Sequence, residues 1–301
     1  MRSTPRSRGS SSIDYDYGGR VSGSVMRTAL VVVLALRLVA AVPRAQDGSS
    51  EAGWRRNLDE VLDLYVRDGY VYYRALKSDR RRLDAYISAL AAESIASAPR
   101  DEQLAFWLNA YNATVLRTVI DHYPIVPHSN AYPPHSVRQI PGAFEGLTHQ
   151  VAGRSLTLDQ IEQTILPGFN DPRVFLALGR GAVGSGRLRS EAFAPGNLER
   201  QLAEVASECA NHAQCVNVDR TANRLLVSSI FSWRSPDFSA AYADRAGATF
   251  SSRSPIERAV LAFIDPRLTS IEKDFLARNE FKVEFEKFDW SLNDLTGRGG
   301  R

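Results

Sequence analysis

The decisive stretch of this sequence is Leu104-Ala-Phe-Trp-Leu-Asn-Ala-Tyr-Asn-Ala-Thr-Val-Leu116, in the middle of a helical pattern over residues 102–122. Apolar residues recur every three or four positions along two adjoining stripes. Apolar residues on so much of a helix circumference predict a central, buried helix. Asn109 and Asn112 would then lie near the core, where their amides need partners. They are expected either to hold a neighbouring loop or to line a pocket.

Shorter helical patterns surround this central one. We expect further helices at residues 54–67, 80–97, 157–166 and 197–210. Thr157-Leu-Asp-Gln160 predicts a capping box that opens the third, and Asn197 is expected to cap the last. Ser254-Pro-Ile-Glu257 and Thr269-Ser-Ile-Glu272 each place a glutamate three residues after a hydroxyl side chain. This spacing predicts capping boxes that open two more helices.

Strands are predicted to be few and short. We expect an extended segment at 70–73, a small hairpin around 148–151, a buried strand at 173–178, and a hairpin pairing 215–219 with 224–229. Residues 281–288 alternate, with Phe281, Val283 and Phe285 facing inward, and residues 231–238 are expected to form an aromatic loop. Short strands among longer helices predict an α+β fold: a helix-rich single domain with a small, mainly antiparallel sheet.

A glycine loop follows the predicted strand at 173–178. It reads Gly179-Arg-Gly-Ala-Val-Gly-Ser-Gly186, and such glycines allow left-handed backbone and close approach to a ligand or another segment. Gly179-x-Gly181-x-x-Gly184 matches the glycine pattern of dinucleotide-binding loops. We reject this match because the next helix begins only after Pro195, and because the nearest acid at the end of a predicted strand, Asp219, is too far along the chain. A phosphate loop is excluded because no Gly-Lys-Ser/Thr follows.

Composition sets the broad class. The 301 residues, 44% of them hydrophobic, allow one large domain or two small ones. The formal charge of +3 is small, and no compact basic patch interleaved with aromatic residues is visible. We therefore expect no nucleic-acid partner.

The N-terminus resembles an export signal. Arg27 precedes a short apolar run at 28–36, and small residues follow, so cleavage after Ala41 or Ala45 is expected; Met26 is an alternative start. We assign residues 1–48 to an N-terminal extension with a signal peptide or anchor, 54–294 to the domain, and 295–301 to a flexible tail. The protein is expected to be exported, periplasmic or secreted, and to touch a membrane only through an uncleaved N-terminal segment.

The chain has two cysteines, Cys209 and Cys215. In an exported protein such a close pair forms a small disulfide, and the alternative is two reduced, partly buried thiols. No CxxC motif and no histidine–cysteine cluster is present in the sequence. We therefore expect neither a metal site nor a cofactor.

Several segments together carry a family resemblance. They are the Phe106–Asn112 segment, Leu156-Thr-Leu-Asp-Gln-Ile-Glu162, the glycine loop, Ser228-Ser-Ile-Phe-Ser-Trp233 and Asp289-Trp-Ser-Leu-Asn293. In this order the sequence resembles the domain-of-unknown-function family 547 over residues 54–294. The family name supplies no activity, and its members are often exported bacterial proteins.

The sequence departs from the pattern that this resemblance implies. Relatives typically carry cysteines where Arg180 and Ser185 stand, Pro-Pro where Gly186-Arg187 stands, and often a histidine where Gln163 stands. A cysteine and a histidine on separate elements suit thiol nucleophile chemistry. This chain has lost both groups.

Three hypotheses follow. The first is a binding or non-catalytic module with a ligand site at residues 179–186, where Arg180 would favour a small anionic ligand; its expected ligand-binding residues are Arg180, Asn109, Asn112, Gly181 and Gly184. The second is a serine-type hydrolase or acyl transferase with Ser185 as nucleophile. Its candidate bases are Glu162 and the histidines His122, His128, His135, His149 and His212. The third is a structural or interaction protein of the cell envelope that presents the aromatic loop at 231–238 and the alternating strand at 281–288 to an envelope protein.

Overall fold

The computed structural model describes residues 49–296, which form a helix-rich α+β domain with small sheets of two or three strands. The predicted fold class is confirmed. The predicted export segment lies outside the described residues, as does most of the predicted tail. None of the described helices is long and apolar enough to cross a membrane.

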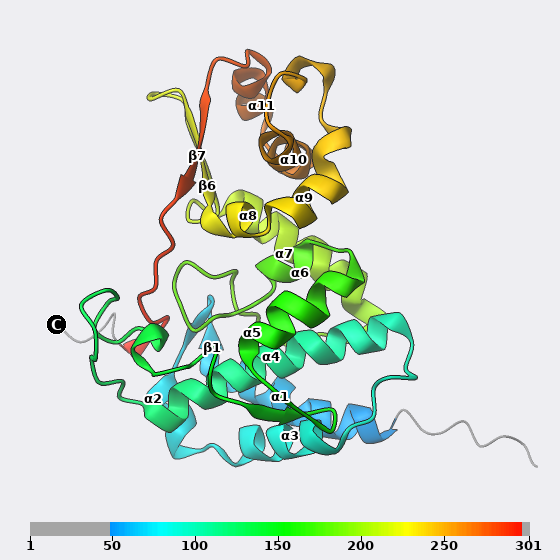
Figure 1. Ribbon diagram of the computed structural model, residues 1–301, viewed down its shortest axis with the longest axis vertical. Coiled ribbons are helices and arrows are strands. Elements are labelled where there is room, and N and C mark those ends of the chain that lie inside the picture. The colour runs from blue at the N-terminus through cyan, green and yellow to red at the C-terminus, as the bar shows by residue number, and fades with distance from the viewer. Residues whose placement is uncertain (1–48, 297–301) are drawn as a thin grey trace, which may run out of the picture. The chain divides into compact units, whose positions relative to one another are not determined.

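Helix α4 (Arg100–His122) is the centre of the domain. Every residue from Leu104 to Ile120 is buried except Arg117, as the all-round apolar pattern predicts. Helices α2 (Tyr73–Ser78) and α3 (Arg81–Ala92) pack against it, and α1 (Ser49–Tyr65) packs against both of them. Figure 1 shows α1, α3 and α4 close together at one end of the domain.

The second half of the chain supplies the other helices. They are α5 (Leu158–Gln160), continued by a π-helical turn (Ile161–Ile165) and a 3₁₀ turn (Leu166–Phe169), then α6 (Arg173–Leu176), α7 (Leu198–Asn211), α8 (Ser229–Trp233), α9 (Ser235–Tyr242), α10 (Pro255–Ile264) and α11 (Ser270–Ala277). Helices α9, α10 and α11 gather beside β6 and β7 (Figure 1). The predicted capping boxes at Thr157, Ser254 and Thr269 are all present.

The strands pair locally, with one exception. Hairpins join β1 (Val66–Arg67) to β2 (Tyr70–Val71), β3 (His149–Val151) to β4 (Arg154–Leu156), and β5 (Val216–Asp219) to β6 (Arg224–Ser228). Strand β7 (Lys282–Glu286) then adds to β6 in parallel, with Leu225 opposite Val283. The predicted hairpins are confirmed.

Strand β7 is less buried than its alternation predicts. Phe281 is buried and Val283 is half-buried, but Phe285 is 37% exposed, so its predicted inward position is wrong. The strand lies at the edge of its sheet, and its apolar face is best covered at the start, where Phe275 of α11 packs against Phe281 with ring centroids 5.9 Å apart.

Two other predicted elements are wrong. The apolar run predicted as a strand at 173–178 is the helical turn α6, which begins after Pro172 in helical backbone conformation. A short buried run does not distinguish a strand from a helix by periodicity. The predicted aromatic loop at 231–238 forms α8 and α9, because Ser228 caps α8 and a proline occupies the first turn of α9.

Two helix ends also differ from the predictions. Asn197 precedes α7 but makes no side-chain cap, because it ends a 3₁₀ turn (Pro195–Asn197) whose backbone runs directly into the helix. Helix α3 ends at Ala92 rather than 97, where Glu93 adopts an extended conformation.

Candidate functional site

The glycine loop at 179–186 is tied to the C-terminal segment of the domain. The amide of Val183 donates to the carbonyl of Ser291 and that of Gly184 to the carbonyl of Asp289, each at 2.8 Å. Asn293 in turn donates its amide to the carbonyl of Gly181 at 3.3 Å. The loop is therefore built as an irregular strand against residues 289–293.

This packing explains the glycines. Gly181 has a φ of +67°, in the left-handed region. A Cβ on Gly184 would lie 2.7 Å from the amide nitrogen of Asp289, and one on Gly186 would lie 1.5 Å from the carbonyl oxygen of Leu176. The last two glycines are thus required by close approach of the chain to itself, whereas the sequence alone left open approach to a ligand.

Arg180 points into the protein and pairs with Glu162. Its Nη2 lies 2.6 Å from Glu162 Oε1, and the two side chains are only 2% and 7% exposed. The guanidinium also donates through Nε to Glu162 and through Nη1 to the carbonyl of Phe175. Tyr111 completes the cluster by donating its hydroxyl to Glu162 Oε2 at 2.9 Å.

The electrostatics favour the charged pair. Burial alone would raise the pKa of Glu162, but Arg180 and the Tyr111 hydroxyl outweigh it and lower the pKa below its ordinary value. Burial likewise opposes the charge on Arg180, and Glu162 reverses the effect and raises the pKa of the guanidinium. Burial and the neighbouring Glu162 carboxylate raise the pKa of Tyr111, so its phenol stays protonated as the donor.

Gln163, at the position where the resemblance implies a histidine, also meets an arginine. Its Oε1 accepts a hydrogen bond from Arg234 Nη1 at 2.6 Å. The Arg234 guanidinium lies 3.7 Å from the centroid of the Phe175 ring and pairs with Asp237 at 3.1 Å. Arg180 therefore stands where a thiol was implied, and Arg234 contacts the glutamine that stands where an imidazole was implied.

Asn109 and Asn112 hold loops rather than face a cavity. The Asn112 amide donates to the carbonyl of Ala177 at 3.1 Å and accepts from the amide of Gly179 at 2.8 Å. Asn109 makes the same pair of bonds to the backbone of Phe193, both at 2.8 Å. The sequence left open whether these amides hold a neighbouring loop or line a pocket, and the structure shows that they hold loops. Any role in ligand binding stays a prediction.

Ser185 has a structural partner. Its Oγ accepts a hydrogen bond from the amide of Arg180 at 3.0 Å, and no histidine or carboxylate in residues 55–296 is hydrogen-bonded to it. Gly179, Arg180, Val183, Gly184 and Ser185 all donate their amides to protein acceptors. The loop therefore does not present these amides to a bound anion.

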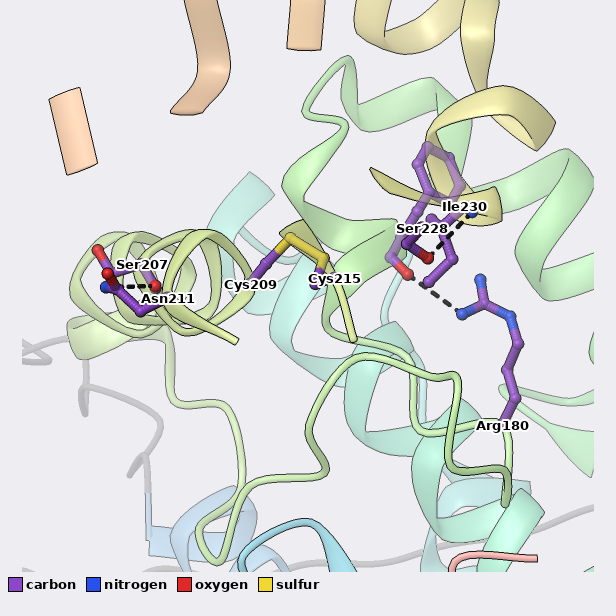
Figure 2. The surroundings of a disulfide bond; sticks show 8 residues. Arg180, Ser207, Cys209, Asn211, Cys215, Ser228 and Ile230 are labelled. Atoms are coloured by element: carbon purple, nitrogen blue, oxygen red, sulfur yellow. Dashed lines mark hydrogen bonds between the residues drawn. A yellow bond between two sulfur atoms is a disulfide. The ribbon is translucent and has the colours of Figure 1, made fainter. Parts of the chain in front are cut away.

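A cavity of about 420 Å³ opens between the outer side of the loop and helix α7. Apolar and sulfur-bearing side chains line part of it, and hydroxyl, amide and imidazole groups line the rest; they include Leu176, Ala182, Val205, Cys209, Cys215, Ile230, Ser185, Ser207, Asn211, His212 and Ser228. Figure 2 shows the disulfide between Cys209 and Cys215, which joins the end of α7 to the segment before β5. The structure thus shows the predicted disulfide rather than two reduced thiols.

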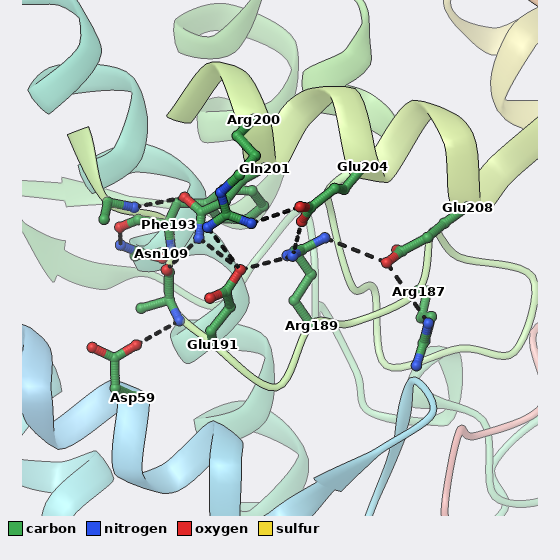
Figure 3. A network of polar contacts seen from close by, with 12 residues as sticks. Asp59, Asn109, Arg187, Arg189, Glu191, Phe193, Arg200, Gln201, Glu204 and Glu208 are labelled. Atoms are coloured by element: carbon green, nitrogen blue, oxygen red, sulfur yellow. Dashed lines mark hydrogen bonds and ion pairs between the residues drawn. The ribbon is translucent and has the colours of Figure 1, made fainter. Parts of the chain in front are cut away.

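The charged residues beside the cavity are mutually paired. Arg189 contacts Glu191 at 2.7 Å, Glu204 at 2.5 Å and Glu208 at 3.4 Å (Figure 3). Arg187, on the cavity wall, pairs with Asp68 at 3.0 Å and with Glu208 at 3.7 Å. Both arginines near this wall are therefore matched by carboxylates.

Two of these wall residues could not be found from the sequence. Ser207 and Asn211 lie at the end of α7, and no motif marks them, because they meet the loop only through the tertiary fold. His212 follows α7, and Asn293 reaches the cavity from the C-terminal segment that carries part of the family resemblance. Among residues 49–296 no group of three or more histidine, cysteine or acidic side chains is arranged to hold a metal ion.

Comparison with known proteins gives one match. The family described as "Protein of unknown function, DUF547" matches residues 95–208, which include α4, the Arg180–Glu162 pair, the glycine loop and most of α7. No curated protein and no solved structure matches the chain.

Proposed function

Because this chain is a DUF547 domain-containing protein whose Arg180 and Ser185 are held by internal partners, we propose that it is a non-catalytic binding module. The ligand site is the cavity between the glycine loop and α7.

The observation that carries the proposal is the buried Arg180–Glu162 pair. It places a permanently charged, non-nucleophilic side chain where the resemblance implies a thiol, and it engages the carboxylate that could have served as a base. An enzyme that needs either group is not built at this loop. A binding role needs only a stable loop beside an open cavity.

The cavity wall favours a small neutral ligand with an apolar body. Leu176, Ala182 and Ile230 supply apolar contacts, and Ser207 and Asn211 supply hydrogen-bonding groups. Arg180 is neutralised by Glu162, and Arg187 by Asp68 and Glu208. The anionic ligand suggested by the sequence therefore gains no support at this cavity.

A cavity-filling substitution tests the binding role. Ser207→Phe, on α7, is expected to fill the cavity and abolish binding of neutral fluorinated fragments detected by ¹⁹F NMR. Ser88→Phe is the matched control, because both serines donate to the carbonyl four residues earlier in a helix and Ser88 is exposed on α3. Failure of every fragment to bind wild-type protein, or equal binding to Ser207→Phe, would contradict the proposal.

A serine-type hydrolase or acyl transferase is the second candidate. It is favoured by one observation: Ser185 and His212 line the same cavity. If Ser185 is a nucleophile, Ser185→Ala abolishes hydrolysis of p-nitrophenyl acetate while the exposed Ser88→Ala does not. We expect no turnover by wild-type protein above that of either variant.

We further propose that the chain is exported to the periplasm or the exterior, where it could meet an envelope protein. The apolar run at 28–36 and the Cys209–Cys215 disulfide support export. Trp233 is 45% exposed and stacks near Trp290, with centroids 6.2 Å apart, which supports a partner surface on α8. Fusion of residues 1–48 to alkaline phosphatase tests export, because that enzyme is active only after translocation.

A further inference from the structure

A second and larger cavity, of about 950 Å³, lies between the α6–α7 region and helices α9, α10 and α11. It shares no lining residue with the cavity beside the glycine loop. Its charged lining residues are Arg100, Arg173, Arg245, Arg267, Lys273, Asp171, Glu199, Asp265 and Asp274. Some of these charged side chains form ion pairs with one another, and others do not.

Arg267 is the cation of this cavity whose charge is least compensated. Its half-buried side chain donates through Nη1 to the carbonyl of Phe263 at 2.6 Å and stands 5.0 Å from the centroid of that ring. Its Nε is buried without a hydrogen-bond partner, and no carboxylate of residues 55–296 forms an ion pair with it. Burial and the nearby positive charge of Arg173 lower the pKa of this guanidinium.

Neighbouring cations differ in their partners. Arg173 is matched by Asp171 and Glu199, each at 2.7 Å, and Lys273 pairs with Asp265 at 3.7 Å. Arg245, in contrast, stands 4.9 Å from the centroid of the Tyr242 ring and has no carboxylate partner within the described chain.

Two further groups complete the wall. The Tyr242 hydroxyl makes no hydrogen bond within residues 55–296, although its ring packs against Phe263 with centroids 5.4 Å apart. Asp274 is the acidic lining residue without an ion pair in that range, and it is exposed at the rim. The wall therefore offers two unmatched guanidinium groups and one free hydroxyl against one exposed carboxylate.

We propose that this cavity is an oxyanion-binding site, in which Arg267 and Arg245 bind the carboxylate or phosphate group of a small organic molecule. Guanidinium groups match the oxygens of both anions and form short, charge-assisted hydrogen bonds with them. Tyr242 supplies a further donor, and the side chains of Phe250, Leu268 and Leu276 supply apolar contacts for the remainder of the molecule. An anion would give Arg267 the counter-charge that residues 55–296 do not supply.

NMR titration of ¹⁵N-labelled full chain tests the site, with inorganic phosphate and benzoate as probes at constant ionic strength. Both are expected to shift the Nε–H resonance of Arg267 saturably. A response to phosphate alone assigns a phosphate-bearing ligand, and a response to benzoate alone assigns a carboxylate. No saturable shift with either probe up to roughly 50 mM, a weak limit for a built site, overturns the proposal.

Variants separate the site from general charge effects. Arg267→Gln is expected to weaken binding about 10-fold or more. Arg258→Gln is the matched control: Arg258 lies on α10, is half-buried, has an Nε without a partner, and does not line the cavity. Equal weakening by both variants would overturn the proposal.

Two additional variants cover the other outcomes. If Arg267→Gln fails to fold, Arg245→Gln at an exposed position is expected to weaken binding about threefold, and unchanged affinity would count against the site. Ser207→Phe is expected to leave anion binding intact, so this site and the cavity at the glycine loop succeed or fail separately.

Discussion

Arg180 and Glu162 form an ion pair with a 2.6 Å Nη2–Oε1 distance, at a position where less than a tenth of either side chain is exposed. The pair joins the glycine loop to the π-helical turn after α5. Its burial leads to specific expectations for how the domain responds to mutation and to acid.

Removal of one member of this pair is expected to cost far more than removal of both. Arg180→Met leaves a buried carboxylate without its cation and is expected to lower the free energy of unfolding by about 3–5 kcal/mol. The double variant Arg180→Met/Glu162→Leu leaves no buried charge and is expected to lie within about 2 kcal/mol of wild type, measured by urea denaturation. A double variant as unstable as the single one would contradict this account.

Acid is expected to weaken the same pair. The pKa of Glu162 is lowered in the folded protein from its ordinary value of 4.5, so the pair contributes fully above that pH and its contribution is lost as the pH falls through the lowered pKa. The stability difference between wild type and Glu162→Gln should therefore shrink below pH 4.5. Urea denaturation between neutral and acidic pH measures it.

A surface glutamate provides the control for that experiment. Glu145, whose side chain is 60% exposed, pairs with Arg138 at 3.3 Å. Glu145→Gln is expected to change stability by less than about 1 kcal/mol. A pH dependence in Glu162→Gln identical to that of wild type would show that the buried carboxylate does not contribute to the acid response.

Asn112 is expected to keep the start of the glycine loop well ordered. Asn112→Ala removes a donor and an acceptor, and leaves the carbonyl of Ala177 and the amide of Gly179 without partners in the core. The expected loss is about 2–4 kcal/mol, with faster hydrogen exchange at the Gly179 amide. Asn211→Ala is the control, because the Asn211 side-chain amide is exposed and donates a single hydrogen bond, to the carbonyl of Ser207. Comparable losses in the two variants would refute a special role for Asn112.

Gly186 is expected to tolerate no side chain. In Gly186→Ala the added Cβ would overlap the carbonyl oxygen of Leu176, so the loop or α6 must move, and we expect a loss of about 2 kcal/mol or more. Gly196→Ala is the control because no atom lies within 4 Å of its added Cβ. Thermal unfolding followed by circular dichroism measures both, and a wild-type melting temperature for Gly186→Ala would be the contrary result.

The elements that sequence analysis predicted are those with a strong local signal. Helix α4 follows from its apolar pattern, and the capping boxes at Thr157, Ser254 and Thr269 follow from three-residue spacing. The apolar run before the glycine loop was wrongly predicted as a strand, because five consecutive buried apolar residues fit a helical turn equally well.

The candidate site was predictable only in part. The loop and its key residues were identified, but the direction of Arg180 was not, because its partner Glu162 lies 18 positions away and the contact depends on the fold. The cavity wall was missed for the same reason. Arg267 gave no signal at all, since an arginine becomes unusual only when burial separates it from carboxylates.

Asn293 has a consequence for how the domain is assembled. Its side chain accepts a hydrogen bond from the Tyr73 hydroxyl at 2.7 Å and donates one to the carbonyl of Gly69 at 2.8 Å. Its backbone N–H donates to the carbonyl of Gly181. The stretch that matches the family, 95–208, contains neither residues 69–73 nor residues 289–293. We therefore expect an excised fragment of residues 95–208 to leave the glycine loop incomplete, because the C-terminal segment that pairs with the loop is synthesised only after it.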